Sequence, residues 1–255
     1  MVHSRRIVGF VCALFASLEA GGCLGKLEPT SCGPTTPIHD YAVGSSVGDT
    51  LTGQTCRHLY QFTTAGQVTL RFKLTSPGFQ TYMQLYDHRS AIIMNSTLSA
   101  ALDTTTTVRM ILGPGTYGLA VAAVNAGTRG TFSLVAAADT VPVSGCGTVW
   151  MTTGIVTTQT LTTADCTQGP GGAAYYYHVY AVVLLQAQEI NATEHATQFP
   201  PGMLLAGQGG TTPSTGDSTG TTAVLNTTVI TQGAYTLFVG SSIAGQTGSY
   251  TLQVQ

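Results

Sequence analysis

The chain has 255 residues and a formal net charge of −2, and only 8% of its residues are charged. This composition excludes a disordered chain, which needs high charge and few β-branched residues. The many glycines and threonines favour an all-β protein with many turns, and the length suits one large domain or two ordinary ones.

The first residues are typical of a secretory leader. Two arginines precede an apolar run, Ile7–Leu18, that is too short to span a bilayer. The following LEAGGC resembles a bacterial lipobox ending at Cys23, although Ala20 stands where leucine is preferred. We therefore expect a lipoprotein-type signal peptide over residues 1–22, a lipid on Cys23 and a tether over residues 23–28. The alternative is ordinary cleavage, which would leave Cys23 as a free thiol.

Four further cysteines follow the leader and are expected to form disulfides: Cys32, Cys56, Cys146 and Cys166. Four cysteines allow three pairings. The segments TLTGQTC and TLTTADC each end in one of these cysteines, and each has one more cysteine upstream. This parallel placement favours Cys32–Cys56 and Cys146–Cys166, each stabilising the fold by about 3 kcal/mol in an oxidising compartment. The short C-x-x-C spacings of a zinc site are absent.

Residues 29–139 and 146–255 are predicted to be two copies of one module, joined by a linker over residues 140–145. GTYGLAV matches GAYTLFV and AGTRGTFSLV matches AGQTGSYTLQV, both at an offset of 118 residues. The two TLT segments lie 110 residues apart, and an insertion around Gly169–Ala174 absorbs the difference. A register that stays constant over two motifs identifies a tandem repeat.

Apolar and polar side chains alternate within each copy. The clearest alternation covers Val68–Leu74, Tyr117–Val121 and Tyr250–Val254, with glycine-rich turns between such segments. No amphipathic helix is evident after the leader. This pattern predicts an all-β fold of two tandem β-sandwich domains of jelly-roll or Greek-key type.

Several segments resemble the bacterial pre-peptidase C-terminal domain: YQFTTAGQVTLRF, FQTYMQLYD and LGPGTYGLAV in the first copy, and TGSYTLQV in the second. That family is a small jelly-roll-like sandwich appended to secreted proteases and other exported proteins. The second copy departs from the pattern at FPPGMLLAG. Some relatives bind calcium or collagen, but the acidic cluster of the calcium site is missing, with only Asp40 and Asp49 in that region. We predict no metal and no cofactor.

One catalytic constellation can be assembled from the sequence. His58, Asp103 and Ser218 have the chain order of a trypsin-like serine hydrolase, and GDSTG is similar to that family's nucleophile motif. The repeat, however, places His58 at the start of a strand and Ser218 in a loop of the other copy. A second G-x-S-x-G match, at Ser46, lacks the helix that a hydrolase elbow requires. We therefore predict no enzyme and keep the hydrolase as an alternative.

The segment YYYHVY, Tyr175–Tyr180, holds the ligand-binding candidate. Matching Tyr177–Val179 to Tyr60–Phe62 of the first copy makes every second side chain of the segment face outward: Tyr176, His178 and Tyr180. Exposed aromatic rings in a row about 6–7 Å apart would stack on sugar rings or on a partner chain. The alternative is that they cover the other domain or the insertion.

The second copy is acidic. From Cys146 to Gln255 there are four acidic residues and no Lys or Arg, giving −4. This copy therefore does not suit nucleic acid or an anionic bilayer, and the dispersed basic residues of the first copy are interpreted as solvated. Glu194 and His195 adjoin in NATEHAT and are interpreted as a solvated pair in a loop.

Together these observations predict a non-catalytic, exported bacterial protein whose tandem β-sandwiches bind a polysaccharide or an extracellular protein partner. We expect it at the outer membrane or cell surface through its lipid anchor, its only contact with the membrane, or otherwise in the periplasm or outside the cell. The alternative to binding is a structural spacer or accessory subunit of a secreted complex.

Overall fold

The computed structural model describes residues 37–53, 55–96, 103–125, 127–141, 143–169, 174–184, 187–207, 210–213, 220–229 and 233–255. The expected signal peptide and tether, Cys23, Cys32 and Ser218 lie outside these residues. In the part that is described, no helix is long and apolar enough to cross a membrane.

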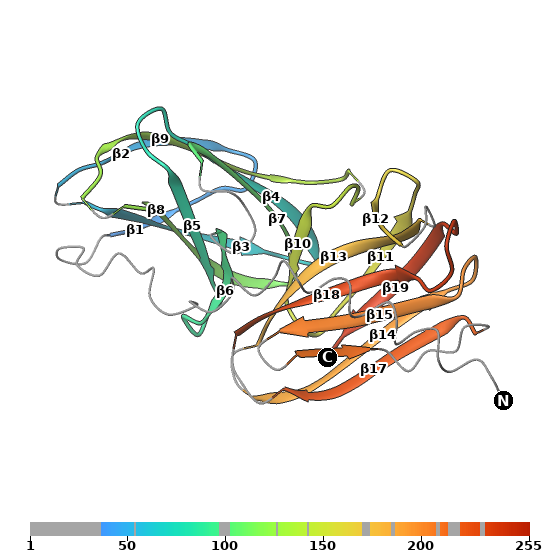
Figure 1. Ribbon diagram of the computed structural model, residues 1–255. Coiled ribbons are helices and arrows are strands. Elements are labelled where there is room, and N and C mark those ends of the chain that lie inside the picture. The colour runs from blue at the N-terminus through green and yellow to red at the C-terminus, as the bar shows by residue number, and fades with distance from the viewer. Residues whose placement is uncertain are drawn as a thin grey trace.

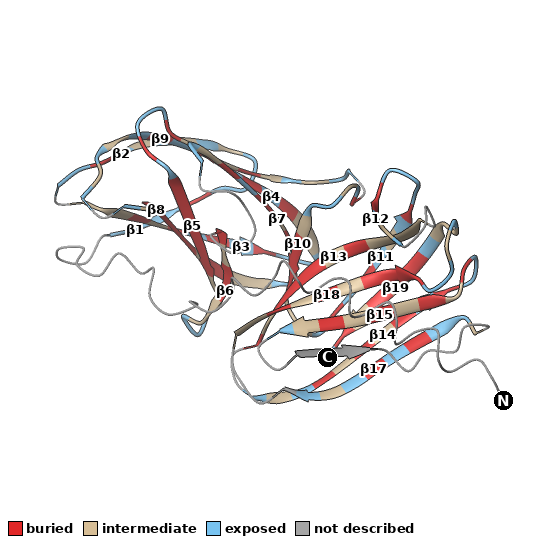
Figure 2. Ribbon diagram, in the orientation of Figure 1, coloured by how far each residue is buried: buried red, intermediate tan, exposed pale blue. Residues whose placement is uncertain are grey.

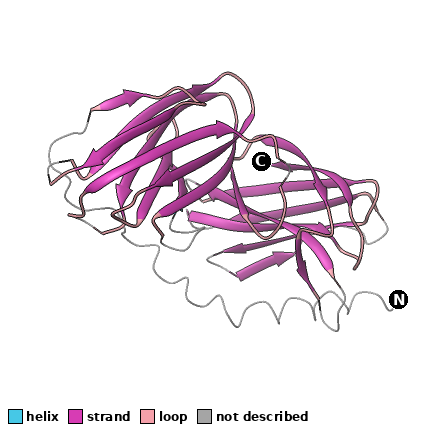
Figure 3. Ribbon diagram, turned by 90° about the horizontal axis from the view of Figure 1, so that it is seen from above, coloured by secondary structure: helices cyan, strands magenta, loops and turns pink. Residues whose placement is uncertain are grey.

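The described chain is built from strands, as predicted, and Figure 3 shows strands joined by turns. The first copy contains β1 (Ile38–Asp40), β2 (Ser46–Leu51), β3 (Arg57–Thr64), β4 (Val68–Thr75), β5 (Thr81–Tyr86), β6 (Ile92–Asn95), β7 (Thr105–Leu112), β8 (Gly115–Ala123) and β9 (Gly130–Ala138). The second contains β10 (Thr148–Met151), β11 (Ile155–Leu161), β12 (Cys166–Gln168), β13 (Tyr175–Leu184), β14 (Gln188–Ala196), β15 (Pro201–Gly207), β16 (Gly210–Pro213), β17 (Thr222–Val229), β18 (Gly233–Ser241) and β19 (Gly248–Val254).

One large sheet runs through both copies (Figure 1). Its strand order is β16-β15-β18-β13-β10-β7-β4-β9-β2, with β12 pairing with β13. A five-stranded sheet, β1-β3-β8-β5-β6, covers the first-copy half, and a four-stranded sheet, β11-β19-β14-β17, covers the second-copy half. Each copy is therefore a β-sandwich, which confirms the predicted fold class.

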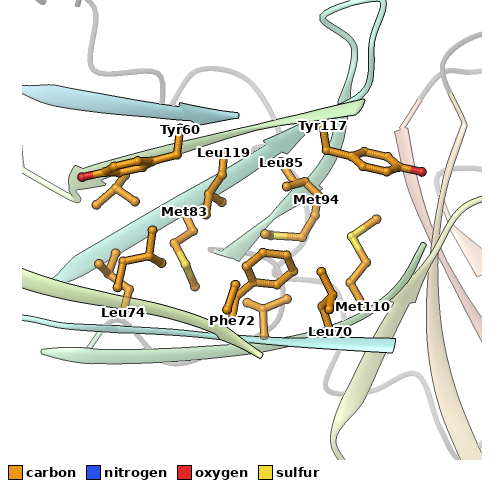
Figure 4. Close-up of a cluster of buried hydrophobic side chains, with 14 of the residues drawn as sticks. Tyr60, Leu70, Phe72, Leu74, Met83, Leu85, Met94, Met110, Tyr117 and Leu119 are labelled. Carbon is orange, nitrogen blue, oxygen red and sulfur yellow. The ribbon is translucent and has the colours of Figure 1, made fainter. Parts of the chain in front are cut away.

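Each sandwich encloses its own hydrophobic core. In β4, Leu70, Phe72 and Leu74 are fully buried, while Arg71 and Lys73 between them are exposed. These side chains meet residues of β3, β5 and β8 from the opposite sheet, among them Met83 and Leu119 (Figure 4). Buried positions, red in Figure 2, run along strands of all three sheets. The predicted period of two thus separates core from surface.

Strand β10 joins the two copies without a break in hydrogen bonding. It pairs in parallel with β13 of its own copy and with β7 of the first copy, where Trp150 lies opposite Met110. The Trp150 side chain is 1% exposed and packs in the first core. Ile111 of β7, in turn, belongs to the second core. The two sandwiches therefore share a sheet and exchange core residues, which makes them one continuous unit.

An ion-pair cluster holds the chain just before β10. The Asp139 carboxylate is almost fully buried and lies 2.9 Å from Arg71 Nη2 and 2.7 Å from Arg109 Nε. Arg109 also donates to the carbonyl of Val141. Because both arginines come from neighbouring strands of the shared sheet, the cluster fixes the path from β9 into the second copy.

One of the two expected disulfides is confirmed. Cys146 and Cys166 are bonded, with Cα atoms 4.6 Å apart, and the bond closes the start of the second copy. Cys56 is also in a disulfide. Because Cys32 lies outside the described residues, the Cys32–Cys56 pairing stays a prediction.

Candidate functional site

The aromatic strand β13 corresponds to β3 of the first copy in a register that differs from the expected one. His58 pairs with Val121 on β8, and His178 pairs with Val239 on β18. The two valines are related by the repeat offset of 118 residues, so the H-x-Y sequence of β13 matches the H-x-Y sequence of β3. The expected match, which placed Tyr177–Val179 on Tyr60–Phe62, is displaced from this one by three residues. An odd shift moves every side chain of a strand to the opposite face.

The prediction that His178 and Tyr180 face outward is therefore wrong. Both side chains are fully buried, and Tyr176 packs, partly buried, against the second core. The row lies on β13 of the shared sheet and faces the second core, and the H-x-Y sequence of the first copy is likewise buried, in β3 of the five-stranded sheet. His178 and Tyr180 therefore cannot meet a large ligand in this fold.

The buried row forms a chain of polar contacts inside the second copy. Nε2 of His178 lies 3.2 Å from Oδ1 of Asp165, and its Nδ1 lies 2.7 Å from the Tyr250 hydroxyl. The Tyr250 hydroxyl is also 2.7 Å from that of Tyr180. Asp165 accepts hydrogen bonds from the backbone N–H groups of Gly145 and Thr162. The chain ties the disulfide loop to the core.

Burial keeps the histidine and tyrosines of this chain uncharged. It lowers the pKa of His178, although the neighbouring Asp165 carboxylate acts in the opposite direction. Burial also raises the pKa of Tyr180 and of Tyr250 above the usual range of a phenol. This chain of buried polar contacts is a structural element of the core.

Glu194 and His195 do not form the solvated loop pair that was expected. They lie in β14, where His195 is exposed and Glu194 is fully buried. Glu194 occupies the position that Leu74 has in the first copy, since β14 and β4 pair equivalently with β19 and β9. Its Oε2 accepts from the Gly202 N–H at 3.1 Å, and burial raises its pKa well above the usual range. The interpretation failed because the strand alternation continues through NATEHAT.

The hydrolase constellation is not assembled in the described residues. The carboxylate that contacts His58 is Asp49, 3.0 Å from Nδ1, while the other ring nitrogen lies 3.1 Å from the carbonyl of Thr50. Asp103 instead accepts from the N–H of Thr104 at 2.6 Å. Within the described ranges, no group of three or more His, Cys, Asp or Glu residues is arranged to hold a metal ion.

An open groove of about 490 Å³ lies on the outer face of the five-stranded sheet of the first copy. Strands β1, β3 and β8 and the turn after β5 line it: Ile38, Arg57, Leu59, Tyr60, Gln61, Tyr86, Asp87, His88, Ser90, Thr116, Tyr117 and Gly118. Sequence reasoning missed this groove, because its residues come from four segments and form no motif.

The floor of the groove is open because of a glycine. Gly118 of β8 lies directly between Gln61 of β3 and Tyr86 of β5. A Cβ atom on Gly118 would lie 3.7 Å from the Cβ of Tyr86, which is ordinary contact. The backbone therefore does not require a glycine here, and a side chain would fill the groove without strain.

The equivalent place in the second copy carries larger side chains. With the repeat offset of 118 residues, Thr236 stands where the first copy has Gly118, and Phe238 stands where it has an alanine. Tyr177, the equivalent of Arg57, packs edge-on against Phe238 with ring centroids 5.6 Å apart. The place equivalent to the floor of the groove is thus occupied by larger side chains in the second copy.

Two charged groups line the groove, Arg57 and Asp87. The Nε atom of Arg57 is buried and has no hydrogen-bond partner among the described residues. Oδ1 of Asp87 accepts from the N–H groups of Arg89 and Ala91, at 2.8 and 2.9 Å. These bonds close the β5–β6 turn, in which Ser90 has a left-handed φ of 62°. Asp87 is therefore fixed by its own turn, with its second oxygen left over.

Comparisons with known proteins do not assign a family. No protein-family model and no curated protein matches the sequence. Among solved structures, the chain is similar to the pre-peptidase C-terminal domain of collagenase from Bacillus anthracis, with 15% identity, 41% of this chain and 98% of that chain covered, and a TM-score of 0.37. It is also similar to a protein from Eubacterium rectale (12% identity, 82% and 73% covered, TM-score 0.26) and to the PBSX exported protein XepA (10% identity, 83% and 87% covered, TM-score 0.25).

Proposed function

We propose that the protein is an exported, non-catalytic binding protein made of two fused sandwiches of the pre-peptidase C-terminal type, and that the groove of the first copy binds a polysaccharide. The observation that carries the proposal is the groove itself. Its volume of about 490 Å³ falls in the range of small-molecule sites, about 300–1,000 Å³, and the Nε atom of Arg57 in its lining has no hydrogen-bond partner among the described residues.

The side chains around the groove suit a sugar chain. Sugars present apolar C–H faces and hydroxyl edges, and the groove offers both kinds of partner. Leu59 and the ring of Tyr86 supply apolar surface, while Gln61, Asp87 and His88 supply planar hydrogen-bonding groups. Such a site orients a hydroxyl-rich ligand through several fixed donors and acceptors.

A protein partner fits the groove less well. Protein interfaces bury roughly 800 Å² on each side and centre on an apolar patch. Among the described large apolar residues that are exposed, only Ile38 lines the groove; the others are Val43, Val141, Val156, Val224 and Ile243. We therefore propose a polysaccharide, and not a protein, as the ligand of the groove.

Export and anchoring complete the proposal. The Cys146–Cys166 disulfide is typical of an oxidising compartment outside the cytosol. The lipobox-like sequence at Cys23 suggests that a lipid tethers the two sandwiches to a membrane surface.

Filling the groove tests the proposal. Gly118→Thr introduces the residue that the second copy has at this position and should weaken retention on the bound polysaccharide at least tenfold. Gly48→Thr is the matched control, because Gly48 lies exposed in β2 and a Cβ there meets only the Phe132 carbonyl at 3.8 Å. Retention on insoluble and immobilised polysaccharides is measured for both variants. Unchanged retention of Gly118→Thr would refute the groove as the site.

The rigid connection between the copies supports one other function. A ten-stranded sheet that passes through both sandwiches also suits a spacer, which needs stiffness and no ligand. Failure of the wild-type protein to bind any polysaccharide in the panel would favour the spacer.

A further inference from the structure

We infer that the groove of the first copy selects an acidic polysaccharide, with Arg57 as the site of the sugar carboxylate. The inference rests on the polysaccharide site proposed above and adds the chemical class of the sugar. It follows from which charged groups of the groove are already neutralised by the protein and which are not.

Arg57 has no ion pair among the residues that the structure describes. Its Nε atom is buried at the groove and has no hydrogen-bond partner in the described part of the chain. By contrast, Arg71 and Arg109 are both committed to Asp139, at 2.9 and 2.7 Å. A guanidinium whose Nε is buried and unpaired gains most from an ionised acceptor, because its planar fork matches the two oxygens of a carboxylate. A neutral hydroxyl would satisfy one N–H but leave the charge unpaired.

The opposite end of the groove carries the opposite charge. Arg57, Leu59 and Gln61 alternate along β3, so their side chains share one face, and Arg57 and Gln61 are about 13 Å apart. Gln61 lies across Gly118 from Tyr86, and Asp87 follows Tyr86 directly. The groove therefore has a cationic end at Arg57 and an anionic end at Asp87.

This polarity defines how an acidic sugar chain would lie. The second oxygen of Asp87 accepts hydrogen bonds from sugar hydroxyls but repels a carboxylate. The carboxylate is therefore directed to the Arg57 end, and a neutral, hydroxyl-rich part of the chain to the Asp87 end. A densely phosphorylated polymer is disfavoured, because it would place an anion against Asp87 as well. Nucleic acid also needs several basic contacts, whereas the groove supplies one arginine.

The test compares one polymer in charged and neutral forms. Polygalacturonate, its methyl ester and dextran sulfate are titrated into the full-length protein by calorimetry. We expect wild-type protein to bind polygalacturonate at least tenfold more tightly than the ester. Arg57→Gln, which keeps two N–H donors but no charge, should abolish that difference. Lys73→Gln is the matched control, because Lys73 is exposed on β4 in the other sheet and loses the same charge.

The remaining variants separate the inference from the proposed function. Arg57→Lys keeps the charge but loses the planar fork, so a partial preference for polygalacturonate is expected. If the wild type binds the ester as tightly as the acid and Gly118→Thr blocks both, the groove binds sugar but the acidic selectivity is wrong. Preferential binding of dextran sulfate would indicate that the groove prefers a sulfate ester to a carboxylate, and it would overturn the inference. Binding of polygalacturonate that survives Gly118→Thr would refute both the inference and the groove.

Discussion

Trp150 is the side chain whose loss should affect both copies at once. Trp150 belongs to β10, the first strand of the second copy. Its side chain is 1% exposed and packs in the core of the first copy. Truncation of a buried tryptophan to alanine costs about 3–5 kcal/mol, because transfer and cavity terms add. The indole Nε1 has no hydrogen-bond partner among the described residues, so the loss in Trp150→Ala is one of packing. That loss is a large part of the roughly 5–15 kcal/mol that stabilises an ordinary domain.

Urea denaturation followed by far-ultraviolet circular dichroism measures this loss. Intrinsic tryptophan fluorescence is unsuitable, because Trp150 is the single tryptophan of the chain. Val156→Ala serves as control, since Val156 is 48% exposed on β11 and should change the unfolding free energy by less than about 0.5 kcal/mol. We expect the wild type to unfold in one transition and Trp150→Ala to unfold earlier. A loss below about 1 kcal/mol would show that β10 does not couple the two cores.

Two further predictions concern the second copy. Burial raises the pKa of Glu194 well above 4.5, so the folded protein keeps a proton that the unfolded chain releases, and stability should fall as the pH rises above 4.5. Glu194→Gln keeps the acceptor for Gly202 N–H and should lose this contribution, so that the unfolding free energy of the wild type relative to the variant falls between about pH 4 and about pH 8; a difference that does not change with pH would contradict the assignment. Replacing Cys146 and Cys166 by serine opens a loop with a sequence separation of 20 and should lower the unfolding free energy by about 2–4 kcal/mol; equal denaturation midpoints with and without reductant would argue against it.

The strands and the repeat were predictable because they depend on local alternation and on a constant offset. The segment Val68–Leu74 needs only its own period of two to become β4, and the match of GTYGLAV to GAYTLFV already relates β8 to β18. Position along a strand is harder to predict, since a register error of one or three residues reverses the faces. The expected match of Tyr177 in β13 to Tyr60 in β3 produced such a register error of three residues. Matching HVYAV to HLYQF, which the sequence also allows, places His178 with His58 and predicts both as buried.

The groove could not be predicted in the same way. It depends on Gly118 standing beside Gln61 and Tyr86 on two other strands, and cross-strand partners are set by the folded sheet. The burial of Glu194 is likewise a property of the second core, because a polar residue in a strand ordinarily indicates the solvent face. Both features depend on contacts between residues that are distant in the sequence, and neither produces a recognisable residue spacing.

The repeat also relates the edge of the groove to the junction between the copies. β10 pairs in parallel with β13 as β1 pairs with β3, so β10 is the second copy's equivalent of β1. In the second copy this strand is covered by β7 and contributes Trp150 to the shared core. In the first copy the residue equivalent to Trp150 is Asp40 of β1, and β1 is an edge strand of its described sheet. A charged residue on an edge prevents another strand from adding there. The first-copy equivalent of the joining strand, β1, is thus left unpaired on one side in its described sheet, and its Ile38 forms a wall of the groove.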